Sequence, residues 1–211
     1  MRKYDRVSRR SFLKYACFSG GAAFISAKAI SAQFCTNYDF NGVKMCEAGI
    51  DSHIANQTIS SSQFRSQWCW AACISMIFDY YGHPVAQSRI VRRLFGSSMV
   101  DIPAMPHQIL QALNISWEDD NGDRFYPEGA QIMTPDRNQN NILASQLLSQ
   151  DTPIIIGSLG HATVLTAMSW AEDVYGRYII NSLTVRDPLR GRRIYSPQEA
   201  GFSHFMAVVR V

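Results

Sequence analysis

Two cysteines that lie four residues apart carry the strongest chemical signal in the chain. Cys69 and Cys73 fall in residues 67–82, a segment without Pro or Gly until Gly82, which predicts a helix ended by that glycine. Cys69 falls at the expected N-terminus, where the helix dipole and unpaired N–H groups favour a thiolate, whereas Cys73 falls inside. We therefore interpret Cys69 as a nucleophile and Cys73 as a small apolar core residue.

A metal site or a redox dithiol is the alternative interpretation of this pair. The redox motif has two residues between its cysteines, and Cys69 and Cys73 have three between them. The chain also has no second Cys/His pair at zinc-finger spacing. The sequence thus predicts no metal and no cofactor.

A nucleophilic thiol needs a base, and the chain has five histidines. His161 follows an apolar run and the glycine-flanked turn 157–160, and it precedes a second apolar run, so it begins a predicted buried strand. A histidine there is well placed to face a cleft, and we predict that His161 is the base. The others, which we interpret as structural, are His53, His83, His107 and His204.

Two side chains compete to orient the imidazole of His161. Asp187 lies where a predicted strand meets the turn at Pro188, so its carboxylate could accept the imidazole N–H, although Asp-Pro is also a common turn signal. Asn181, in the predicted strand 178–182, is the rival. Triad geometry favours Asp187.

Two glutamines are candidates to stabilise the oxyanion that forms when a thiolate attacks a carbonyl. Gln63 lies six residues before Cys69 and Gln67 lies two before it. Either side-chain amide could face the carbonyl oxygen together with the backbone N–H of Cys69, and loop geometry does not choose between them.

As a set, these residues resemble a known family. Residues 63–82, a later Gly160-His161 before an apolar strand, and Asp187-Pro188 resemble the leader peptidases that process double-glycine bacteriocin precursors, and related stand-alone secreted papain-like peptidases. The resemblance covers roughly residues 60–195. It implies a papain-like cysteine peptidase with Cys69 as nucleophile, His161 as base, Asp187 as its orienting group and Gln63 as the oxyanion residue, in preference to Gln67.

The chain differs from the leader peptidases in two ways. Trp68-Cys69-Trp70 stands where they usually have Asp-Cys-Gly, and they are fused to a membrane transporter for which 211 residues leave no room. The resemblance therefore favours the stand-alone secreted group, and it does not identify the substrate.

The remaining elements define the fold class that must position these residues. Helical spacing of apolar residues predicts further helices at 84–95, 105–114 and 141–150, whereas residues 116–141 are polar and turn-rich. The acidic run 118–123 within them lacks the register of a calcium-binding EF-hand and is interpreted as a surface loop. Helices first and strands afterwards predict an α+β, papain-like fold: a helical lobe packed against an antiparallel sheet.

The N-terminus has the pattern of an export signal. Ser8-Arg9-Arg10-Ser11-Phe12-Leu13-Lys14 resembles a twin-arginine signal, and an apolar stretch and small residues suited to cleavage follow it. We expect residues 1–32 to be removed after recognition by the twin-arginine export machinery. The mature protein is then periplasmic or secreted, with no stable membrane anchor.

Residues 33–60 are interpreted as an N-terminal arm, and 61–211 as the peptidase domain. The arm contains Cys35 and Cys46, for which a short-loop disulfide is the simplest interpretation in an oxidising compartment. A propeptide is the alternative interpretation of the arm, and no residue pattern in it indicates this role.

Charge and the predicted site together define the expected partners. The first fourteen residues hold six basic side chains against one acidic, which leaves the rest of the chain near −2 and predicts no nucleic-acid partner. We expect hydrolysis of a peptide or protein substrate. Two alternatives stay open: acyl transfer to an amine, as in a transpeptidase or transglutaminase-like enzyme, and a peptidase-like binding module without activity.

Overall fold

The structure is a computed structural model that describes residues 32–96, 99–133, 138–158, 160–196, 199 and 203–211. The predicted signal segment falls outside these residues, except for Ala32, where the first strand begins. The elements, in chain order, are β1 (Ala32–Cys35), β2 (Val43–Gly49), α2 (Ser52–Thr58), α3 (Cys69–Tyr80), α4 (Gln87–Phe95), α5 (Pro106–Ala112), β3 (Trp117–Glu118), β4 (Arg124–Phe125), β5 (Glu128–Met133), α6 (Asn138–Ser149), β6 (Ile154–Ser158), β7 (His161–Asp173), β8 (Tyr178–Asp187), β9 (Gly191–Tyr195) and β10 (Ser203–Arg210).

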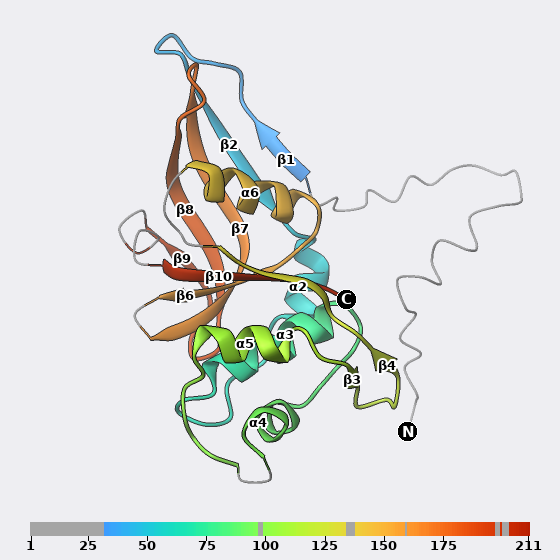
Figure 1. Ribbon diagram of the computed structural model, residues 1–211. Coiled ribbons are helices and arrows are strands. Elements are labelled where there is room, and N and C mark those ends of the chain that lie inside the picture. Colours follow the sequence, from blue (N-terminus) through green and yellow to red (C-terminus); the bar gives the residue numbers. More distant parts are fainter. Residues whose placement is uncertain (1–31, 97–98, 134–137, 159, 197–198, 200–202) are drawn as a thin grey trace, which may run out of the picture.

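One antiparallel sheet organises the molecule, and β7 is its central strand (Figure 1). The first half of β7 pairs with β6, its second half pairs with β2, and β8 runs along its other side. The path β1-β2-β7-β6-β10-β5 forms the sheet, and β9 extends it from β8. A long strand bonded on both sides is a rigid support, and the first residue of β7 is His161.

Helix α3 is the buried centre of the helical lobe. Almost every side chain from Cys69 to Phe78 is buried, so this part of the helix presents no face to solvent. It packs on β7, while α4 packs against α3 and α5. Figure 1 shows α3, α4, α5 and the small β3–β4 hairpin gathered at one end of the molecule, with the long strands and α6 at the other. This is the predicted α+β arrangement of a helical lobe and an antiparallel sheet.

The helices predicted from apolar spacing appear at α4, α5 and α6, within a few residues of their expected bounds. Helix α3 ends as predicted: Gly82 has a φ of +89°, a conformation that glycine adopts without steric cost, and Gly82 N–H bonds the carbonyl of Asp79.

Strands also occur where none was predicted. Residues expected to form an arm make β1, β2 and α2, and β2 pairs along the second half of β7. The turn-rich stretch 116–141 contains β3, β4 and β5, with β5 paired to β10. The order of helices first and strands afterwards is therefore incomplete, because two strands precede the helices and join the main sheet.

The predicted disulfide is confirmed. Cys35 in β1 and Cys46 in β2 are directly opposite in the strand register and are joined by an S–S bond. The bridge ties the edge strand β1 to β2. Within the described part of the chain, no helix has the length and apolarity needed to cross a membrane.

Candidate active site

Cys69 is the first residue of α3, as its sequence position predicts. Trp68 precedes the helix without making a side-chain cap, so no capping side chain occupies the first N–H groups of the helix. The backbone N–H of Trp70 and that of Ala162, the second residue of β7, both hydrogen-bond the Cys69 sulfur. Cys69 is 8% exposed, so a reagent or substrate can still reach it.

His161 and Asp187 come together because β7 and β8 are paired antiparallel. His161 begins β7 after a turn in which Gly160 has a φ of +77°, and Asp187 ends β8. His161 Nε2 lies 2.8 Å from Asp187 Oδ1. The imidazole also hydrogen-bonds the Cys69 side chain. Since Nε2 is engaged by Asp187, Nδ1 is the nitrogen left for the sulfur.

Opposite pKa shifts accompany this arrangement. Burial raises the pKa of Cys69, but the hydrogen bond from His161, the N–H of Ala162 and the charge of His161 outweigh it, so the pKa lies below the ordinary thiol value. The pKa of His161 is raised, chiefly by its bond to Cys69 and then by Asp187, against the lowering effect of burial. Both shifts favour the thiolate–imidazolium pair over the neutral pair.

Asp187 is held as an ionised acceptor. Burial raises its pKa, yet the hydrogen bonds from His161 and from the Leu189 N–H, together with nearby charge, bring it below the usual value. Leu189 N donates to the same Oδ1 over 2.8 Å, while Arg193 Nη1 lies 3.8 Å from Oδ2. The Asp-Pro turn that the sequence predicts therefore exists and fixes the carboxylate that faces His161.

Gln63 lies beside this turn but is engaged with its own loop. Its backbone N–H bonds the carbonyl of Pro188. Its Nε2 donates to the carbonyls of Arg65 and Ser66, each over 2.8 Å, and its Oε1 is buried without a partner. Both amide protons are thus committed to the loop that leads into Cys69.

Sequence reasoning missed the segment that supports the residues on either side of Cys69. Trp68 Nε1 donates to the carbonyl of Val100 over 2.8 Å, and Trp70 Nε1 donates to that of Ile102 over 3.2 Å. Between them, Asp101 accepts from Ser66 Oγ over 2.8 Å and from the backbone N–H of Gln67 over 2.9 Å. The two tryptophans beside Cys69 were the available signal, because buried indole N–H groups need acceptors.

The rival residues lie in other contacts. Asn181 Nδ2 faces Met45 Sδ at 3.8 Å, and Gln67 is exposed.

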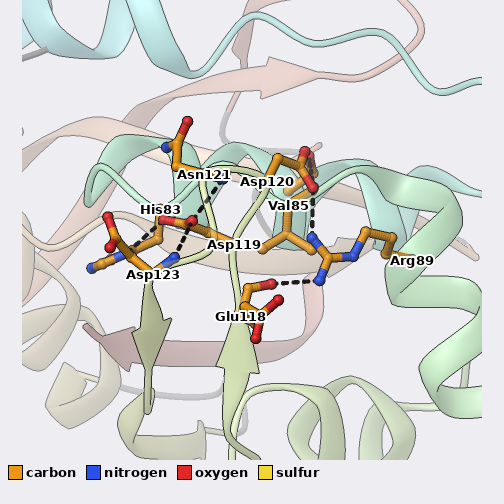
Figure 2. A network of polar contacts seen from close by, with 9 residues as sticks. His83, Val85, Arg89, Glu118, Asp119, Asp120, Asn121 and Asp123 are labelled. Carbon is orange, nitrogen blue, oxygen red and sulfur yellow. Dashed lines mark hydrogen bonds and ion pairs between the residues drawn. The ribbon is translucent and has the colours of Figure 1, made fainter. Parts of the chain in front are cut away.

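The other histidines also lie away from Cys69. His53 faces Gln57, and His83 bonds Asp119 Oδ2. The other oxygen of Asp119 accepts from backbone N–H groups of the acidic loop (Figure 2). His107 is exposed on α5, and the side chain of His204 lies outside the described part of the chain. Among the described residues, His, Cys, Asp and Glu form no group of three that could hold a metal ion.

A helix-borne thiol that faces a histidine from a sheet lobe defines the class of papain-like cysteine peptidases. The family model described as papain-like cysteine protease AvrRpt2 matches residues 50–208, about three quarters of the chain, and the chain belongs to this family. The protein is thus a cysteine peptidase, as the sequence predicted.

The chain was also compared with curated protein sequences and with solved structures. No curated protein sequence matches the chain. Among solved structures, the chain is similar to a double glycine motif protease from an AMS/PCAT transporter, crystallised in complex with the leader peptide. The two share 18% sequence identity at a TM-score of 0.45, over 71% of this chain and 89% of the other.

Proposed function

We propose that the protein hydrolyses peptide bonds with Cys69 as nucleophile, His161 as acid and base, and Asp187 as the group that orients His161. The observation that carries this proposal is the continuous chain of hydrogen bonds from the Cys69 sulfur through the imidazole to the buried Asp187 carboxylate. The lowered pKa of Cys69 and the raised pKa of His161 both favour a reactive thiolate.

The reaction proceeds in two stages. The Cys69 thiolate attacks the carbonyl carbon of the peptide bond, and the carbonyl π electrons move to oxygen. As the tetrahedral intermediate collapses, the C–N bond breaks and His161 gives its proton to the leaving amine. A water molecule then attacks the thioester and transfers a proton to His161, and the carboxylic acid leaves as the C–S bond breaks.

Oxyanion stabilisation is assigned to Gln63 and to the backbone N–H at the start of α3. Gln63 is anchored beside Pro188 through its backbone, close to the turn that holds Asp187. In this proposal its amide exchanges one of its two loop carbonyls for the developing oxyanion when substrate is bound. Loss of one such donor typically costs about 10²–10³ in rate.

We further propose that the protein works after export through the twin-arginine route, in the periplasm or outside the cell. The sequence of residues 8–14 supports this, and so does the Cys35–Cys46 disulfide, because such bonds persist in oxidising compartments.

Thiol labelling of matched variants tests the site. Iodoacetamide should alkylate Cys69 rapidly across pH 5–8, with adducts located by mass spectrometry, and His161→Ala should abolish the rapid phase. Cys73→Ala is the matched control and should label like the parent, because Cys73 is fully buried and its pKa is raised well above normal by burial. Slow labelling of Cys69 at every pH would contradict the proposal and favour an inactive binding module.

Product analysis separates hydrolysis from acyl transfer, which uses the same residues. Casein is incubated with the protein and an excess of a primary amine, and the products are analysed by mass spectrometry. We expect new C-terminal carboxylates. Products that carry the added amine in an amide bond would instead identify an acyl transferase.

A further inference from the structure

A second site is suggested by a pocket on the helical lobe. It has a volume of about 600 Å³ and lies between α4 and the β3–β4 hairpin. Its lining consists of four arginines and three residues of the hairpin region: Arg89, Arg92, Arg93, Arg124, Ser116, Trp117 and Glu118. None of the residues assigned to the peptidase mechanism lines it.

The pocket has an excess of positive charge that the protein does not neutralise. Arg89 Nη1 bonds Asp120 at 2.7 Å, and Arg89 Nη2 bonds the carbonyl of Glu118 at 2.6 Å (Figure 2). Arg124 Nε lies 3.7 Å from Glu118, and both side chains are largely exposed, so this ion pair is weak. Arg92 and Arg93 make no ion pair within the described part of the chain. With both carboxylates counted, four guanidinium groups retain a net charge of +2.

The arrangement fits an anionic ligand. Arg89 is held in place by its two contacts, and guanidinium groups bind carboxylates in a bidentate manner. Arg92 and Arg93 are exposed at the rim, as expected for charges that meet the side chains of an extended chain.

The size of the pocket favours a peptide over a single oxyanion. Its volume lies in the range of sites that hold a ligand of many atoms. Its arginines come from α4 and from β4, so positive charge lines the pocket from two elements, which suits several acidic side chains spaced along one peptide.

Helix α4 connects this pocket to the active-site region. Gln87, its first residue, is buried and accepts from the backbone N–H of Phe64, while its Nε2 donates to the carbonyl of Ser62. The helix thus starts against the loop that holds Gln63 and ends with Arg92 and Arg93 in its last turn. Nine helical residues span roughly 13 Å, which about four residues of extended chain can cover.

We propose that this arginine-lined pocket is an accessory docking site for an acidic segment of the protein substrate, remote from the scissile bond. The choice of a substrate as occupant rests on the proposed peptidase function. The affinity for an acidic peptide rests only on the pocket.

Direct binding tests the proposal without catalysis. The full chain with Cys69→Ala is titrated into a fluorescein-labelled peptide of six glutamates, and fluorescence anisotropy is measured at low and at high salt. We expect binding that weakens with salt, and weakens about tenfold or more in Arg92→Glu/Arg93→Glu. A hexaglutamine peptide with the same label should not bind.

Matched variants make the result specific. Arg210→Glu changes an exposed arginine outside the pocket and should leave binding unchanged, and Arg92→Gln/Arg93→Gln should give an intermediate loss. Equal binding to the parent and to Arg92→Glu/Arg93→Glu would overturn the proposal. Displacement of the peptide by inorganic pyrophosphate as effectively as by unlabelled hexaglutamate would also overturn it, in favour of a small-oxyanion site.

Alkylation of Cys69 separates this proposal from the proposed function. In a background that retains Cys69, Arg92→Glu/Arg93→Glu should label with iodoacetamide as fast as the parent. If Cys69 is labelled at the normal rate but the peptide does not bind, the docking proposal is wrong and the proposed function is unaffected. If the peptide binds but Cys69 is not labelled rapidly, the proposed peptidase mechanism is wrong and the acidic-peptide binding site stands.

Discussion

The same side chain behaves in two ways on one helix, and the difference comes from position alone. Cys69 and Cys73 are one turn apart, yet the pKa of Cys69 is lowered and that of Cys73 is raised. Both are desolvated. Cys69 has a histidine and open N–H groups beside it, whereas Cys73 has only burial and the negative charges of Cys69 and Asp187. Burial disfavours the thiolate at both positions, and only at Cys69 do hydrogen bonds and the charge of His161 outweigh this effect.

In the proposed mechanism the upper pH limit of activity follows the pKa of His161, which the bond to Cys69 and then the Asp187 carboxylate both raise. In that mechanism the active form is the thiolate–imidazolium pair, so we expect activity to rise as Cys69 ionises and to fall as His161 loses its proton. Asp187 raises the pKa of His161. Asp187→Asn should therefore move the alkaline limb of the kcat/KM profile to lower pH and reduce kcat/KM about tenfold or more.

A second His–Asp pair provides the control for this prediction. His83 Nδ1 lies 3.1 Å from Asp119 Oδ2 and does not touch Cys69. Asp119→Asn should leave the pH profile of activity unchanged, since the Asn carbonyl can still accept from the loop N–H groups. A loss of activity in Asp187→Asn with no shift of the alkaline limb would argue that Asp187 serves folding only.

Among the elements, the segment around Cys69 is held by its bonds to residues 100–102. Trp68→Phe keeps a buried aromatic ring but removes the donor to the Val100 carbonyl, which should lower the free energy of unfolding by about 1 kcal/mol beyond any packing loss. Urea denaturation measures this. Trp70→Phe is the comparison: its bond to Ile102 is longer, so the loss should be smaller. Equal losses would mean that ring volume alone matters.

Strand β6 depends on the absence of a side chain at Gly157. A Cβ at this position would lie 1.9 Å from the Phe205 ring, closer than any real contact. Gly157→Ala should therefore lower the free energy of unfolding by about 1–3 kcal/mol, and Phe205→Leu in the same chain should recover part of it. Thermal unfolding of the single and double variants checks both. Strictly additive losses would show that the ring is not the obstacle.

Local patterns predicted the elements that carry the candidate site residues. Residues 67–82 lack helix breakers, His161 follows a glycine turn and Asp187 precedes a proline, and each signal lies within a few residues of the group it positions. The arm strands were missed because β2 pairs with the distant β7, and β1 in turn pairs with β2; short-range patterns do not encode this long-range pairing. Likewise, the bonds from Trp68 and Trp70 cross more than thirty residues of chain.

For the whole molecule, the main sheet joins the N-terminal residues to the strands that carry His161 and Asp187. Strand β2 pairs along β7, the strand that begins with His161, and the Cys35–Cys46 bond fastens β1 to β2. The disulfide closes a short loop, so its removal should cost about 2–3 kcal/mol. Because β1 is the edge strand, this loss concerns the arm more than the site.

The redox state of this pair therefore reports where the protein resides. If the twin-arginine signal directs export, Arg9→Lys/Arg10→Lys should hold the chain in a reducing cytoplasm, where Cys35 and Cys46 stay reduced. Expression in a bacterium with this route, followed by fractionation and a gel shift with a maleimide polymer, measures both location and oxidation. Arg2→Lys/Arg6→Lys changes basic residues outside the twin-arginine pair, and this variant should be exported normally and carry the disulfide. An exported, oxidised Arg9→Lys/Arg10→Lys variant would show that the two arginines do not direct transport.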